Sequence, residues 1–158
     1  MASSADHVIF EHELMPLIRE RLAAGQTVRY LPFRGTSMLP MLRQGKDSVE
    51  LSPLPQRLSR FDLPVYQYPS GLYVMHRVVE VREDHYVCLG DNTYRYEHIR
   101  PEQMIALVTA FKRGEKRIPV TDPAYRRYVR LWHALFPLRK GLWGLKNGVK
   151  GLLRRLLK

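Results

Sequence analysis

Three short stretches of the sequence contain the residue types needed for nucleophilic catalysis. Ser37 lies in GTSMLPMLRQGKDSV, His76 in YVMHRVVEV and Asp91 in CLGDN. Pro40 cannot donate to a sheet ladder, so Ser37 is predicted to lie where a strand gives way to a turn. A serine is a poor nucleophile unless a base takes its proton and a third group orients that base. The three stretches contain one residue suited to each role.

The spacing of the second and third stretches predicts how the histidine and the aspartate meet. If these stretches form a hairpin in which Val81 faces Tyr86, counting back along both strands places His76 opposite Asp91. Directly opposed side chains have Cβ atoms about 4.5–5.5 Å apart. A carboxylate at that distance would fix the imidazole tautomer and stabilise the imidazolium. A register slipped by one residue would instead oppose Arg77 to Asp91 and give an ion pair.

Together the three stretches resemble the active-site boxes of a known peptidase group. GTSMLPMLRQGKD, HRVV and GDN are similar, in order and spacing, to the serine, general-base and aspartate boxes of signal peptidases and LexA-like peptidases, the S24/S26 group. The resemblance covers roughly residues 27–113. The base is a lysine in the bacterial signal peptidases and LexA-like proteins, and a histidine followed by Arg-Val in the archaeal and endoplasmic-reticulum enzymes. His76-Arg77-Val78 therefore resembles the histidine-type branch.

The resemblance implies a role for each site residue. Ser37 would be the nucleophile and His76 its general base. Asp91 would orient His76, or Glu97 would do so, because a further acid six places after the aspartate of the third box can complete the triad in histidine-type enzymes. Both acids remain candidates. The resemblance implies no metal and no organic cofactor, and the histidines of the chain show no spacing typical of a metal site.

The sequence also departs from the family pattern at two positions. Lys46 separates a glycine and an aspartate that are usually adjacent after the serine box. Gly35 stands where many members have a serine that helps to form the oxyanion hole. The remaining donors for an oxyanion are the backbone N–H of Ser37 and Thr36.

A short helix is expected before these stretches. Residues 8–24 place apolar side chains at helical spacing, and Gly25 follows as a C-cap. The predicted buried stripe consists of Leu14, Leu17, Ile18 and Leu22.

From Thr27 the apolar period shifts towards two, in short runs rich in Val, Tyr, Ile and Phe that are separated by Gly, Pro, Ser, Asp or Asn. The pattern predicts an antiparallel β domain, and with the resemblance a mainly β fold of the signal-peptidase and LexA type. The expected organisation is an N-terminal helix (residues 1–26), the peptidase domain (27–122) and a helical tail (123–158).

The tail carries most of the net charge of +11. Residues 1–122 contain 16 Lys or Arg and 15 Asp or Glu, whereas residues 123–158 contain ten basic residues and no acidic one. The tail reads as two amphipathic helices separated by a break at Pro137. We expect residues 138–158 to bind anionic membranes peripherally. One alternative is that these residues dock on the β domain or on a second subunit. Nucleic-acid binding is a further alternative, and we do not expect it.

The composition also indicates a compartment. The single cysteine, Cys88, is expected in the core and cannot form an intramolecular disulfide, which suits a reducing environment. No window reaches the roughly 18 apolar residues of a spanning helix, so the membrane anchor of true signal peptidases is not expected. These features favour a cytoplasmic protein, either free or peripheral on the inner face of the membrane.

The expected function is therefore cleavage of a peptide or precursor leader by a serine endopeptidase. The substrate would add as an extended strand to the edge formed by residues 28–33. The alternative is a non-catalytic regulatory or scaffold protein of the same fold, whose basic tail binds membrane or nucleic acid.

Overall fold

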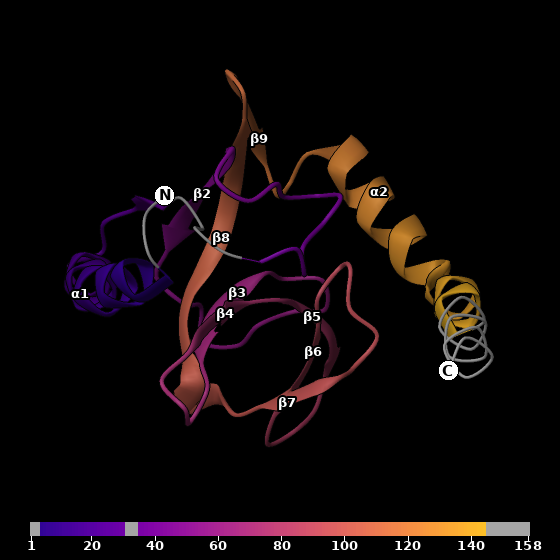
Figure 1. Cartoon of the computed structure of the whole chain (residues 1–158), viewed down its shortest axis with the longest axis horizontal. Helices are drawn as coiled ribbons and strands as arrows, with labels where there is room; N and C mark the ends of the chain where they lie inside the picture. Colours follow the sequence, from indigo (N-terminus) through magenta and orange to yellow (C-terminus); the bar gives the residue numbers. More distant parts are fainter. Residues whose placement is uncertain (1–3, 31–34, 145–158) are drawn as a thin grey trace, which may run out of the picture. The chain divides into compact units, whose positions relative to one another are not determined.

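The chain folds mainly into antiparallel sheets, which confirms the predicted β class. The computed structural model describes residues 4–30 and 35–144. Within them, one sheet has the strand order β1 (Val28–Tyr30), β2 (Asp47–Ser52), β8 (Met104–Arg113), β3 (Pro64–Gln67) and β4 (Tyr73–Met75), with β9 (Lys116–Pro119) on β8. A second sheet has the order β5 (Arg77–Val81), β6 (Tyr86–Leu89) and β7 (Glu97–Ile99). Figure 1 shows β8 as the long strand along which the first sheet is built.

The predicted N-terminal helix is α1 (Ser4–Ala23), and it contacts β1 and β8. It ends as predicted, because Gly25 has φ of 75° and the N–H groups after the helix bond back to the carbonyls of its last turn. Ile18 and Leu22 are buried as predicted, together with Met15, whereas Leu14 is only half-buried and the expected burial of Leu17 is wrong. The stripe follows the helical spacing through Met15, which leaves Leu17 on the outer side.

Side chains of both sheets form one core cluster. Tyr66 and Met104 contribute from the first sheet, and Val78, Cys88 and Ile99 contribute from the second. Cys88 is buried as predicted, and its burial, followed by the charge of Glu97, raises the pKa of the thiol to about 12. The thiol is therefore protonated at physiological pH, as expected for a packing residue.

The predicted strand around His76 is divided between the two sheets. β4 ends at Met75 in the first sheet and β5 begins at Arg77 in the second, so His76 is the residue at which the chain crosses. A short 3₁₀ helix, η1 (Pro101–Gln103), follows β7 and leads into β8.

The chain divides into two compact units, residues 1–122 and 123–158. The second contains α2 (Pro123–Ala134), and residues 136–144 are also helical. The helix is interrupted at Leu135, two residues before the break predicted at Pro137, although the N–H of Arg139 still donates to the carbonyl of Leu135 at 3.0 Å. Pro137 lies in the first turn of the second segment, where a helix does not need its N–H. Among the described residues no helix is both long and apolar enough to cross a membrane.

Candidate active site

The loop that carries Ser37 follows directly after Gly35, which has φ of 102°. It turns tightly, because the N–H of Leu39 donates to the carbonyl of Thr36 and the N–H of Leu42 to that of Met38. The side chains of Met38 and Leu42 are buried, whereas Ser37 is only half-buried. The loop is therefore anchored by its apolar residues and leaves the serine accessible.

Hydrogen bonds from Asn92, in the Gly-Asp-Asn turn, hold the loop that carries Ser37. The N–H of Asn92 donates to the carbonyl of Ser37 at 2.7 Å, and its Nδ2 donates to the carbonyl of Thr36 at 3.1 Å. Thr93 closes the turn, because its Oγ1 accepts from the N–H of Gly90 at 3.0 Å. The Gly-Asp-Asn triplet is thus a turn whose asparagine positions the backbone on both sides of the serine Cα.

Gly90 is the point at which the serine and histidine segments approach each other. A Cβ at this position would lie 2.8 Å from the carbonyl oxygen of Ser37 and 3.0 Å from Cδ2 of His76. Both distances are shorter than normal contacts, and the first one involves backbone. A residue larger than glycine would therefore separate the segments that bring Ser37 and His76 together.

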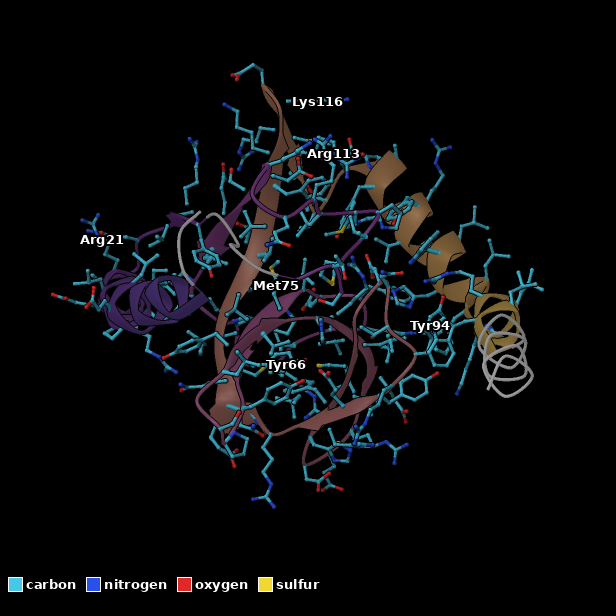
Figure 2. The ribbon with its side chains drawn as sticks, viewed as in Figure 1. Arg21, Tyr66, Met75, Tyr94, Arg113 and Lys116 are labelled. Atoms are coloured by element: carbon cyan, nitrogen blue, oxygen red, sulfur yellow. The ribbon has the colours of Figure 1, made fainter. Side chains whose placement is uncertain are left out.

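Glu97 is the carboxylate that contacts His76. Its Oε2 lies 2.8 Å from Nδ1 of the imidazole. The hydroxyl of Tyr66 donates a very short hydrogen bond to the same oxygen and lies 3.2 Å from Nδ1. His76 is buried, and the side chain of Glu97 retains 20% of its exposure. Tyr66 comes from β3 and Glu97 from β7, so both sheets contact the imidazole. Figure 2 labels Tyr66 and Met75, the residue that precedes His76 in the chain.

The surroundings of Glu97 keep it ionised. Burial alone raises the pKa of this carboxyl, but hydrogen bonds with His76, Tyr66 and Tyr68, together with the charge of His76, outweigh burial and hold the pKa below its usual value. Burial, followed by the hydrogen bond to Glu97, raises the pKa of both tyrosines, which therefore remain donors. With an ionised carboxylate at Nδ1, we assign the imidazole proton to Nδ1. Nε2 is then the nitrogen that can accept a proton.

Asp91 does not contact His76 as the sequence register predicted. It accepts two hydrogen bonds from Arg77, from Nε to Oδ1 at 3.0 Å and from Nη2 to Oδ2 at 2.9 Å. Val81 does pair with Tyr86, but a bulge between Val78 and Glu80 shifts the remaining register.

Arg77 therefore lies opposite Leu89. Its side chain reaches Asp91 two residues further along the same face. The guanidinium also donates to the carbonyl of Phe61 at 3.2 Å and contacts Sδ of Met41 at 2.9 Å. The buried pair therefore connects segments of all three sequence boxes.

A pocket of about 360 Å³ opens at Ser37 and His76. Its walls include Tyr30 at the end of β1 and Tyr73 to Met75 of β4, the two ends of the strand order in the first sheet. The other apolar lining side chains are Met38, Leu42, Val65 and Leu72, and the polar ones include Arg43, Gln44 and Asp47. The described part of the chain thus places an apolar pocket next to the serine and histidine.

Asp47 supports the wall of this pocket and was not identified as a site residue from the sequence. It is buried and accepts from the backbone N–H of Arg43 at 2.9 Å and from its Nη2 at 2.7 Å, and Nε of Arg113 lies 3.6 Å away. Burial raises the pKa of Asp47, but the hydrogen bonds and charge of Arg43 and the charge of Arg113 outweigh burial and lower it. Arg113 also donates to the carbonyls of Pro40 and Met41. Asp47 therefore fixes the turn that follows the serine loop, despite the inserted Lys46.

Tyr66 is the other residue that sequence reasoning missed. It lies in the run PVYQY, whose pattern predicted only a strand, and no motif distinguishes it from the other tyrosines. In the described residues, no group of three or more His, Cys, Asp or Glu is arranged to hold a metal ion.

Comparison with known proteins adds no family assignment. No protein-family model matches the chain, and neither the curated proteins nor the solved structures include a significant match.

Proposed function

We propose that this chain is a serine endopeptidase of the signal-peptidase type. The observation that carries the proposal is the placement of His76, whose Nδ1 contacts an ionised Glu97 while its Cδ2 and the backbone carbonyl of Ser37 both lie beside Gly90. Both residues line one pocket. The resemblance of the three boxes to the histidine-type S24/S26 enzymes supports the same roles.

In the proposed reaction, Oγ of Ser37 attacks the carbonyl carbon of the scissile peptide bond while Nε2 of His76 takes the hydroxyl proton. The backbone N–H of Ser37 stabilises the oxyanion. The C–N bond then breaks as His76 gives the proton to the leaving amine, which produces an acyl-enzyme. Water attacks the ester by the same route and releases Ser37. Glu97 holds the tautomer and stabilises the imidazolium in both steps, and Tyr66 positions Glu97.

The substrate would bind as an extended strand along β1 or β4. Both strands lie at the ends of the sheet order and contribute residues to the pocket. Residues 31–33 of the edge expected from the sequence lie outside the described residues. Backbone hydrogen bonds would supply affinity, and the apolar pocket would accept a side chain near the cut bond. We assign this activity to the cytoplasm, with the leader of a small precursor peptide as substrate.

An active-site acylating reagent tests this proposal on the purified full chain. A fluorophosphonate should attach covalently to Ser37, as located by mass spectrometry of the labelled peptide. Ser37→Ala should abolish labelling, whereas Ser59→Ala, which alters an exposed serine outside the pocket, should not. The alternative, a non-catalytic regulatory or scaffold protein, predicts that the native protein does not react at Ser37.

A further inference from the structure

A row of exposed leucines lies along the helices of the second unit. Leu131, Leu135, Leu138 and Leu142 keep 62%, 42%, 62% and 60% of their exposure. Their spacing of four, three and four residues places them on one side of a helix. The N–H of Leu135 donates to the carbonyl of Leu131, and that of Arg139 to Leu135, so the helical pattern continues past the end of α2. We call these four residues the leucine face.

The leucine face is separate from the apolar side that the chain already buries. Tyr125, Val129 and Phe136 are buried. At about 100° per residue, they project roughly 120° away from the leucine face. The helices therefore present a second apolar side that is left in contact with solvent.

Basic residues flank the leucine face. Arg127 and Arg130 project on one side of it, and Arg139 projects on the other with its guanidinium 3.7 Å from the centroid of the Trp132 ring. Residues 123–158 contain ten Lys or Arg and no acidic residue. A second copy packed on this face would bring two strongly positive segments together. A nucleic acid would match the charge but would leave four leucines without an apolar partner.

We propose that the leucine face docks on an anionic phospholipid surface, with the helices lying in the plane of the interface. The leucines would enter the boundary between headgroups and acyl chains, and the flanking arginines would contact lipid phosphates. The expectation from the sequence concerned residues 138–158, of which residues 145–158 lie outside the described residues. The leucine face begins at Leu131, within the described part. The proposal does not depend on the peptidase activity.

Flotation of the full chain with lipid vesicles tests the apolar part of this proposal. The protein should float with vesicles of phosphatidylcholine and phosphatidylglycerol at low salt, and should not float with phosphatidylcholine alone. The double variant Leu131→Gln/Leu138→Gln should bind at least about tenfold more weakly, because each buried methylene contributes to partitioning. Leu17→Gln is the matched control, since Leu17 is a similarly exposed leucine on α1, and it should bind like the wild type.

The double variant Arg127→Gln/Arg130→Gln tests the contribution of the basic residues to vesicle binding. It should weaken binding about fivefold for each charge removed. Arg21→Gln on the outer side of α1 is the control (Figure 2). Added salt should weaken binding of every variant.

Three results would overturn the proposal. The first is equal binding of the leucine variants and the wild type, which would assign binding to charge alone. The second is a wild-type protein that ignores anionic vesicles or binds neutral ones equally well. The third is a leucine variant that unfolds or changes its molecular mass in solution, which would show that the face packs on protein.

Discussion

His76 and Arg77 are neighbours in the chain, and each contacts one carboxylate, yet the two pairs occupy different environments. Arg77 and Asp91 retain 0% and 1% of their side-chain exposure, whereas His76 and Glu97 retain 8% and 20%. The Arg77–Asp91 pair is fully buried, and the Arg77 guanidinium also contacts the carbonyl of Phe61 and Sδ of Met41. The His76–Glu97 pair borders an open pocket that Ser37 also lines.

The difference explains why Asp91, the acid that the sequence register placed opposite His76, is not the partner of His76 in the proposed reaction. A buried, doubly hydrogen-bonded arginine pair cannot exchange protons, because the guanidinium stays charged at any accessible pH. An imidazole with one nitrogen held by a carboxylate can transfer a proton through the other nitrogen. Within the proposed peptidase reaction, we therefore assign a structural role to Asp91 and the orientation of His76 to Glu97, and the following predictions test that division.

The largest effect is expected for His76→Ala. Without the base, the rate of Ser37 acylation by a fluorophosphonate should fall by about 10⁴-fold or more, because nucleophile and base act as one unit. The free energy of unfolding, measured in urea, should change far less than the rate does. Acylation at the wild-type rate would show that another group activates the serine.

Removing Asp91 should mainly affect stability. Asp91→Ala leaves the Arg77 guanidinium buried without its carboxylate, which should lower the free energy of unfolding by about 3–5 kcal/mol. The double variant Arg77→Met/Asp91→Leu should recover much of that loss, because it removes both charges. An Asp91→Ala protein with wild-type stability in a urea titration would contradict the structural role.

Gly90→Ala should disturb the place where the serine and histidine segments approach each other. The new Cβ would overlap the carbonyl of Ser37 and displace the serine from the histidine. We expect about a 10²-fold slower acylation, the size expected for a displacement of about 1 Å. Gly141→Ala is the matched control, because a Cβ at that position meets no heavy atom within 4 Å. Equal acylation rates for the two variants would show that Gly90 does not position Ser37 relative to His76.

The smallest effect concerns pH. The folded pKa of Glu97 is depressed below its unfolded value, so Glu97 contributes stability above the unfolded pKa and loses it as the pH falls through the folded pKa. The stability difference between wild type and Glu97→Gln should therefore narrow between about pH 5 and pH 3. Urea titrations across this range measure the difference. A difference that stays constant would show that Glu97 is not held in its ionised form.

Much of the fold could be predicted from the sequence. The switch of apolar period at Thr27, the capping glycine Gly25 and the Val81–Tyr86 pairing are local signals, and the structure confirms them. The short strand β7, which carries Glu97, was not expected, because three residues give too little periodicity to recognise.

The candidate site was harder to predict because it depends on contacts between sheets. The bulge after Val78 adds one residue to β5, and no composition signal marks it, so the predicted register failed beyond that point. Tyr66 reaches His76 only because the chain crosses between sheets at the histidine. The motif spacing named Glu97 as one of two acids but could not decide between them.

The most direct test compares Glu97→Gln with Asp91→Asn in one experiment. The acylation rate of Ser37 is measured per folded molecule, with the folded fraction taken from urea titrations of the same preparations. Our account predicts that Glu97→Gln slows acylation by about 10²-fold to 10⁴-fold, because the imidazole loses the partner that fixes its tautomer, and that it costs less stability than Asp91→Asn. Asp91→Asn should lose stability but react at close to the wild-type rate per folded molecule. The reverse pattern, slow acylation in Asp91→Asn and a normal rate in Glu97→Gln, would contradict the account.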